Sequence, residues 1–202
     1  MRHLTETDYV TSTWSGGKTI EIAIRPEGAA YAGRDFWWRI SSATVELEES
    51  DFTVLPDYDR LIAPLSGRME LVHRKAEATD DPGTGPFLLS PYTVHSFDGA
   101  DLTHSKGQCT DFNLMLRKGK CKGKISPLVP VEGGAKGQRF EPDPGTDVLL
   151  LYAAKGSAAV CFQDAIEQLI EKEALLLEKE EITSFELALP PGGCVMAVEI
   201  TG

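Results

Sequence analysis

The chain has 202 residues, 42% of them hydrophobic, and a formal net charge of −11 at neutral pH. This length suits one large domain or two small ones, with enough apolar side chains for a substantial core. The acidic balance repels phosphate backbones and anionic lipid, so nucleic acid and membrane surfaces are poor partners. No apolar run approaches the roughly 18 residues of a spanning helix, and the first residues lack the apolar core of a signal peptide. The cysteines are far apart in the sequence, which is typical of a reducing compartment, and we expect a cytoplasmic protein.

Short runs with the alternation of β-strands recur along the chain. Residues 19–24 place Ile20, Ile22 and Ile24 on one face and Thr, Glu and Ala on the other, because successive side chains of a strand point to opposite faces. Residues 36–45 alternate in the same way, and Gly and Pro separate the runs. Many short strands with such punctuation predict an all-β fold of the barrel or sandwich type.

The two halves of the chain share this pattern of strands. In each half, an apolar strand runs to a glycine, Gly67 or Gly156, and a second apolar strand returns. The matching blocks are residues 61–72 with 149–162, 87–97 with 174–185, and 107–115 with 192–200. The nearly constant offset between these blocks indicates two copies of one β-unit. We therefore expect one half over residues 1–120 and a second over residues 121–202.

Two loops and one ambiguous segment complete the pattern. Residues 79–86 and 119–137 are rich in Gly and Pro, which predicts surface loops, and the second loop would separate the two halves. Residues 165–181 contain strong helix formers, but the repeat predicts two strands that turn near Glu171 and Lys172. We follow the repeat and expect strands there.

Five motifs, taken in order, resemble a known family. They are W-S-G-G-K-T-I-E-I (14–22), F-W-W-R-I-S-S-A (36–43), F-T-V-L-P-D-Y-D-R-L (52–61), H-S-F-D-G (95–99) and D-F-N-L-M-L-R (111–117). As an ordered set over residues 10–119, they are similar to the HutD/Ves family, which is named for its place in bacterial histidine-utilisation operons. The resemblance implies a bicupin fold of two jelly-roll barrels and a regulatory or ligand-sensing role linked to histidine breakdown. Lys18 and the order Asp98-Gly99 depart from the family pattern, which indicates a divergent branch.

The sequence offers no metal-binding or catalytic motif. A cupin metal site takes an H-x-H pair, a Glu and a further His, whereas His3, His73, His95 and His104 form no H-x-H pair. Two histidines that met in the fold would still make a weak metal site. The chain has no G-x-S-x-G, and no neighbouring histidine activates Cys109. We therefore predict no metal, no cofactor and no catalytic residue.

The candidate ligand-binding residues lie on the polar faces of the predicted strands. In residues 111–117, Asp111 and Asn113 share a face opposite Phe and Leu, and such a face either meets water or lines the inside of a barrel. The candidates are Glu21, Arg39, Arg60, His95, Asp111 and Asn113, with Trp14 and Trp38 as apolar walls. The second half carries V-M-A-V-E in place of D-F-N-L-M, and Thr183 in place of His95. The first half is therefore the expected binding half, and the second is a degenerate copy.

The chemistry of these candidates suits a small acid. Arginine binds carboxylates through two parallel hydrogen bonds, and Glu21 or Asp111 would accept an N–H group inside a pocket with apolar walls. We expect a cupin that binds a small-molecule carboxylate with a nitrogen function, an intermediate of histidine degradation, as a non-enzymatic regulator or sensor. Two alternatives stay open: a metal-independent isomerase or hydrolase with Glu21, His95 or Asp111 as general acid–base, and a structural interaction module with an exposed apolar patch. A homodimer through sheet edges, frequent in cupins, also stays open.

Overall fold

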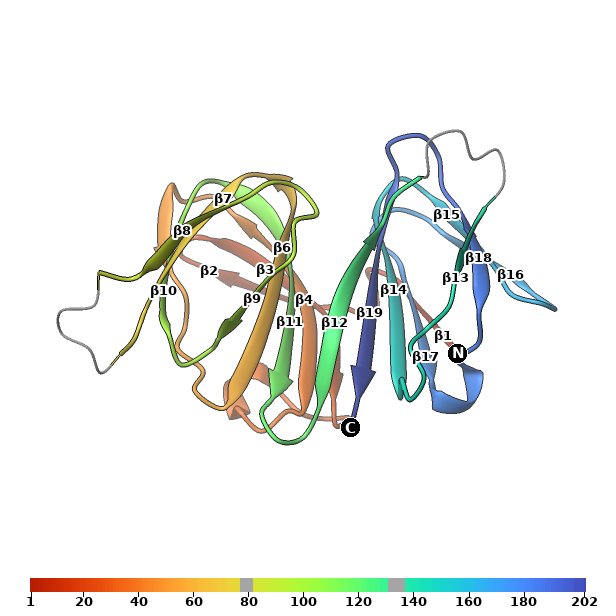
Figure 1. The fold of residues 1–202 in the computed structure, drawn as a ribbon, viewed down its shortest axis with the longest axis horizontal. Helices are drawn as coiled ribbons and strands as arrows, with labels where there is room; N and C mark the ends of the chain where they lie inside the picture. The colour runs from red at the N-terminus through yellow and green to blue at the C-terminus, as the bar shows by residue number, and fades with distance from the viewer. Residues whose placement is uncertain (77–81, 131–136) are drawn as a thin grey trace. The chain divides into compact units, whose positions relative to one another are not determined.

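The computed structural model describes residues 1–76, 82–130 and 137–202, which form strands β1 to β19 and two single-turn 3-10 helices, η1 and η2. Within these described ranges, no helix is long and apolar enough to cross a membrane. The residues group into two compact units (Figure 1). We call Val10–Cys121 the N-terminal unit, and Met1–Tyr9 together with Lys122–Gly202 the C-terminal unit.

The N-terminal unit is made of two antiparallel sheets. Its elements are β2 (Val10–Trp14), β3 (Gly17–Arg25), η1 (Tyr31–Gly33), β4 (Trp38–Val45), β5 (Glu49–Asp51), β6 (Tyr58–Gly67), β7 (Met69–Arg74), β8 (Thr84–Leu89), β9 (His95–Asp98), β10 (Leu102–Lys106) and β11 (Cys109–Arg117). The larger sheet has the order β2-β3-β4-β11-β6-β9, and the smaller has the order β5-β10-β7-β8. Antiparallel strands of this length bury one face against the opposing sheet, and here Ile62, Met69 and Leu71 form the core with Leu89 and Cys109.

The C-terminal unit has the same construction. Its elements are β1 (Arg2–Leu4), β12 (Lys122–Leu128), β13 (Gln138–Phe140), β14 (Val148–Lys155), β15 (Ala158–Cys161), β16 (Ile166–Leu169), β17 (Ala174–Glu178), η2 (Lys179–Glu181), β18 (Phe185–Ala188) and β19 (Cys194–Thr201). The sheets have the orders β1-β17-β14-β19-β12 and β13-β18-β15-β16. The buried residues of its core cluster are all apolar, among them Leu149, Leu151, Val195 and Ala197.

Strand order relates the two units and confirms the predicted duplication. The run β9-β6-β11-β4 corresponds to β17-β14-β19-β12, and β5-β10-β7-β8 corresponds to β13-β18-β15-β16. In both units a glycine with positive φ follows or ends the first strand of the matching hairpin: Gly67 (φ 75°) is the last residue of β6, and Gly156 (φ 70°) comes directly after β14. The all-β bicupin fold that the sequence predicted is the fold of this chain.

One part of the predicted alignment is wrong. The sequence paired residues 87–97 with 174–185, whereas the sheet order makes β9 the counterpart of β17 instead of β18. His95 pairs with Ile62 of β6, and Leu175 pairs with Leu151 of β14, so Leu175, and not Thr183, occupies the position of His95. The offset between residue numbers falls from 89 at the hairpin glycines (156 − 67) to 80 here (175 − 95), because the β7–β8 connection is longer in the N-terminal unit.

The ambiguous segment is strand, and the predicted loops are shorter than expected. Residues 165–181 hold β16 and β17, joined by a turn in which Lys172 has a φ of 73°. Pairing with β15 and β14 therefore outweighs the helix propensity of this segment. The 119–137 loop prediction is wrong for 122–128, which form β12, and the 79–86 prediction is wrong from Thr84 onward, where β8 begins. Residues 79–81 and 131–136 lie outside the described residues.

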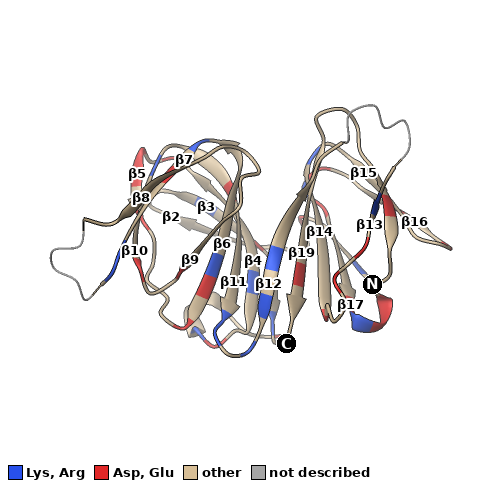
Figure 2. Ribbon diagram, in the orientation of Figure 1, with Lys and Arg blue, Asp and Glu red and all other residues tan. Residues whose placement is uncertain are grey.

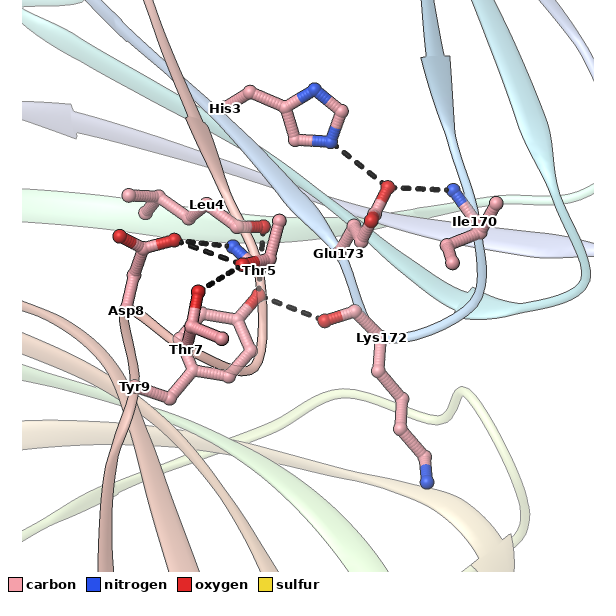
Figure 3. Close-up of polar contacts among 9 residues, drawn as sticks. All are labelled: His3, Leu4, Thr5, Thr7, Asp8, Tyr9, Ile170, Lys172 and Glu173. Carbon is pink, nitrogen blue, oxygen red and sulfur yellow. Dashed lines mark hydrogen bonds and ion pairs between the residues drawn. The ribbon is translucent and has the colours of Figure 1, made fainter.

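The first nine residues belong to the C-terminal unit, although the sequence analysis counted them with the N-terminal half. Strand β1 pairs with β17 along the sheet edge. Figure 3 shows the polar contacts that hold this segment against the C-terminal unit. The Tyr9 hydroxyl donates to the carbonyl oxygen of Lys172 at 2.8 Å, and Nε2 of His3 lies 2.9 Å from Oε2 of Glu173. Asp8 accepts a hydrogen bond from the backbone N–H of Thr5 at 2.9 Å.

Candidate functional site

A cavity of about 430 Å³ opens into the N-terminal unit. It lies against the inner face of β4, β6 and β11 and is bordered by residues from β2, β3, β5, η1 and the segment after β5. Its lining residues are Ser12, Thr13, Trp14, Thr19, Tyr31, Arg39, Ser41, Ala43, Val45, Ser50, Asp51, Phe52, Thr53, Arg60, Asp111, Asn113 and Met115. A volume of this size suits a small organic molecule.

Strand register sets the polar groups of the cavity side by side. On β11, Asp111, Asn113 and Met115 share the face that looks into the cavity, because alternate residues of a strand point the same way. Met115 is paired with Arg39 of β4 on one side and with Arg60 of β6 on the other. The two arginines that the sequence singled out therefore flank one strand at one level of the barrel.

Arg39 is held by an acidic partner. Its Nε donates to Oε2 of Glu21 at 2.6 Å, and its Nη1 donates to Oγ of Ser41 at 2.9 Å. Both members of this ion pair are largely buried, with side-chain exposures of 6% and 13%, so the positive charge of Arg39 is already balanced by the protein. Glu21 itself is not among the cavity-lining residues.

Arg60 is buried with much less compensation. Its Nη2 donates to Oδ1 of Asn113 at 3.3 Å, and its Nε has no hydrogen-bond partner. The guanidinium lies 4.9 Å from the ring of Phe52 and 5.0 Å from that of Phe97. Cation–π attraction to these rings therefore replaces part of the stabilisation that water would give the charge. Burial lowers the pKa of Arg60 to about 10, and the side chain nevertheless stays charged near neutral pH. The charged positions along β4 and β6 can be followed in Figure 2.

Asp111 is the acidic counterpart on the same face. It is 3% exposed, and its Oδ1 has no hydrogen-bond partner. Burial raises the pKa of the Asp111 carboxyl to about 6, against the opposing influence of the positive charge on Arg60. Unpaired buried polar atoms are rare in folded proteins and call for an explanation, and two of the four among the described residues belong to Arg60 and Asp111.

A tyrosine wall that the sequence analysis missed closes the cavity on the η1 side. The Tyr31 ring lies between the guanidinium groups of Arg34 at 3.9 Å and Arg39 at 4.6 Å. Burial would raise the pKa of Tyr31, but hydrogen bonds from Arg34 and Thr53 outweigh it and lower that pKa overall. Tyr31 stands in an irregular stretch between β3 and β4, where strand alternation gives no signal, so only its aromatic character was available to reveal it.

The other predicted residues divide between cavity and core. Trp14 lines the cavity mouth, and its ring lies over Gly16, where an added Cβ would come within 2.1 Å of it. Trp38 is 3% exposed and does not line the cavity, because it neighbours Arg39 on β4 and therefore points to the opposite face. His95 does not line the cavity either.

His95 instead contacts His73, which lies on the other sheet of the unit. The two Nε2 atoms are 2.9 Å apart, and Nδ1 of His73 is 2.9 Å from Oγ1 of Thr103. Burial lowers the pKa of both imidazoles, so the pair is neutral near pH 7 and one ring donates to the other. Phe97 packs against both rings and against Arg60, so it separates the histidine pair from the cavity residue Arg60. In the described ranges, no three His, Cys, Asp or Glu side chains gather as a metal site.

The C-terminal unit carries apolar residues at the matching positions. Strand β19 pairs with β12 and β14 as β11 pairs with β4 and β6, and the register irregularity falls at the same place. By this register, Val195 corresponds to Asp111 and Ala197 to Asn113, while Leu149 corresponds to Arg60. All three of these C-terminal residues have no exposed surface. The polar cavity is therefore a property of one unit and is not required by the barrel architecture.

Two related jelly-roll units, one of which carries charged residues in its cavity where the other has apolar residues, define a bicupin. Among solved structures, the chain is similar to a conserved protein of unknown function from Pseudomonas aeruginosa PAO1, with 25% identity, a TM-score of 0.76, and coverage of 100% of this chain and 98% of the other. It is also similar to HutD from Pseudomonas fluorescens SBW25, determined in a formate condition, with 21% identity, a TM-score of 0.73, and coverage of 99% and 97%. A bacterial pirin from Escherichia coli in complex with nickel(II) shares the fold at 7% identity and a TM-score of 0.62, with coverage of 98% and 97%.

The model of the HutD family matches residues 6–196. The chain belongs to the HutD family, as its sequence motifs indicated. A search of curated proteins finds no match.

Proposed function

We propose that this protein is a non-enzymatic sensor or regulator that binds a small nitrogen-containing carboxylic acid in the cavity of its N-terminal unit. The observation that carries this proposal is Arg60, a buried guanidinium in the cavity wall whose Nε has no partner. A buried charge without a full set of hydrogen bonds costs stability. A carboxylate would supply two parallel hydrogen bonds and the missing negative charge.

The surroundings of Arg60 support an organic acid over an inorganic anion. Phe52 and Tyr31 give the cavity aromatic walls, and Asp111 offers an acceptor for a ligand N–H group. Arg39 is already paired with Glu21, so we assign the carboxylate to Arg60. The family name suggests intermediates of histidine degradation as the ligands, and we extend that suggestion to this chain as part of the proposal.

A thermal-shift screen tests the proposal. The purified protein is heated with histidine, urocanate, formiminoglutamate, formylglutamate and glutamate, with and without divalent metals. A ligand at about 100 times its dissociation constant stabilises the fold by roughly 2.7 kcal/mol, which raises the melting temperature by several degrees.

The variants separate specific binding from a general charge effect. Arg60→Ala should abolish the shift, whereas Arg139→Ala, which removes an exposed arginine of the C-terminal unit paired with Glu141, should keep it. Equal shifts in both variants would reject the assignment to Arg60. A rise with metal alone would point to a metal protein instead.

A second candidate function follows from Asp111. A carboxyl whose pKa is raised to about 6 by burial is suited to general acid–base catalysis near neutral pH. An enzyme would consume one of the acids in the screen, which NMR of the incubated ligand detects. Unchanged ligand after prolonged incubation would favour the binding protein.

A further inference from the structure

The cavity contains one unused donor and one unused acceptor on charged side chains. Nε of Arg60 and Oδ1 of Asp111 are both buried and lack hydrogen-bond partners. The two residues come from adjacent strands, β6 and β11, and both line the cavity. A ligand that satisfied both atoms would need an acceptor group for Arg60 and a separate donor group for Asp111.

We propose that Asp111 is the specificity-determining residue of this cavity, and that it selects acids carrying an N–H donor over isosteric acids that lack one. This inference rests on the proposed function, in which Arg60 holds the ligand carboxylate. Glu21 is excluded from this role because its Oε2 already accepts from Arg39 at 2.6 Å. Asp111 is the acid whose acceptor atom is left open.

The C-terminal unit supplies an independent comparison. Val195 stands at the position of Asp111, and Leu149 at that of Arg60. Both valine and leucine are fully buried there, so the barrel folds around apolar side chains at these two positions. A buried carboxylate is costly in the same setting, and its presence in one unit alone points to a ligand.

Asp111 also makes the selection depend on pH. An ionised carboxylate accepts a hydrogen bond from N–H, whereas a protonated carboxyl donates O–H to a carbonyl. The charged and titratable groups around it are Arg60 of β6, Arg39 of β4 with its partner Glu21, Tyr31 of η1, and Cys109 on the same strand. Burial raises the pKa of Cys109 to about 12, so this thiol stays neutral. Asp51, at the cavity edge, is 85% exposed in its side chain and pairs with His104.

The pair of His73 and His95 also titrates in this barrel. The charges of His95, Asp101, Arg60 and Lys75 also influence the pKa of His73. Because neither histidine lines the cavity, protonation of the pair should affect both members of an isosteric ligand pair alike. Comparing two such ligands therefore isolates Asp111.

N-acetylglycine and 4-oxopentanoate are such a pair, because they differ only in an N–H group that is replaced by a methylene. Calorimetric titration of the full chain near pH 7.5 should show N-acetylglycine binding about ten- to a hundredfold more tightly, the value of a hydrogen bond to a charged acceptor. Near pH 5, one unit below the pKa of about 6 for Asp111, the preference should shrink about tenfold.

Two variants assign the effect. Asp111→Asn keeps a carbonyl acceptor but does not titrate, so its preference should not change with pH. Asp111→Val, which copies Val195 of the other unit, should bind the two acids equally. Circular dichroism and the melting temperature confirm that each variant is folded, and Asp111→Asn carries the test if the valine variant does not fold.

Each outcome decides between the claims. Equal binding of the two acids by the natural protein would overturn selection by Asp111 and leave the carboxylate site intact. A preference that persists in Asp111→Val would assign the selection to another residue and overturn the inference. Failure of both acids to bind would contradict the proposed function, and the inference would fall with it.

Discussion

The double substitution Arg60→Leu with Asp111→Val should abolish ligand binding and stabilise the protein. It gives the N-terminal unit the side chains Leu149 and Val195 of the C-terminal unit, where both are fully buried in an apolar core. Replacing a buried pair of charges by hydrophobic residues of suitable size is often neutral or stabilising. Arg60 pairs with Met115 and Asp111 pairs with Pro64, so the two positions lie on the same face of adjacent strands but four residues apart. The double variant changes both, so neither charge is left behind.

The magnitude follows from the pKa shifts. Burial lowers the pKa of Arg60 by roughly two units from its ordinary value, to about 10, and raises that of Asp111 from 3.8 to about 6. At about 1.4 kcal/mol per unit, each ionised group is destabilised by about 3 kcal/mol relative to the unfolded chain. These shifts already include the attraction between the two charges, and the packing of Arg60 on Phe52 and Phe97 offsets part of the cost. We expect a gain of about 1–4 kcal/mol, the range found for comparable replacements.

The pH dependence has a definite sign. The folded pKa of Asp111 is above its unfolded value, so this group favours the folded state below pH 3.8 and this contribution is lost as pH rises toward about 6. The gain from the double variant should therefore be larger at pH 7 than at pH 4.

Urea unfolding followed by tryptophan fluorescence measures the gain as a higher midpoint at unchanged slope. A double variant that is less stable than the natural protein by more than about 1 kcal/mol, at the same slope, would refute the view that this site trades stability for binding.

Three further predictions concern other parts of the chain. Burial lowers the folded pKa of His73 and His95 below the ordinary 6.5, so the stability of the protein should fall as pH drops below 6.5. In thermal unfolding, His95→Gln should reduce the dependence of the melting temperature on pH in this range. An unchanged dependence would mean that other groups cause it. Gly16→Ala should displace the Trp14 ring, because the new Cβ would lie 2.1 Å from it, and the fluorescence change should be absent in a Trp14→Phe background. Tyr9→Phe removes hydrogen bonds to two main-chain carbonyls and should destabilise the C-terminal unit by about 1 kcal/mol in urea unfolding, whereas no loss would mean that β1 contributes little.

Strand alternation carried most of the sequence-based prediction. The alternation of residues 111–117 placed Asp111 and Asn113 on one face, and the structure shows that this face lines the cavity. The same rule applies to β4, where Trp38 and Arg39 are neighbours and must point to opposite faces. Since Arg39 lines the cavity, Trp38 could not line it as well. Alternation fixes which side chains share a face, but it does not say which face is inside.

Other parts of the site depend on contacts that no local pattern reveals. Tyr31 reaches the cavity from the short helix η1. His73 of β7 and His95 of β9 belong to different sheets and meet only because the two sheets face each other. Arg39 and Glu21 neutralise each other through a hydrogen bond of 2.6 Å, and the sequence does not show that these two side chains meet. In residues 165–181 the repeat predicted the conformation better than helix propensity did, because pairing with neighbouring strands determines the conformation there.

The placement of the first nine residues has a consequence for folding during synthesis. The N-terminal unit is continuous in sequence and complete at Cys121, so it can fold as soon as that residue has left the ribosome. Strand β1, by contrast, must wait for β17, which ends at Glu178. At roughly 5–20 residues per second, this delay is about 3–11 seconds. During this delay, residues 1–9 are attached to a folded N-terminal unit of which they are not a part. They become ordered only when the C-terminal unit, which is synthesised last, folds.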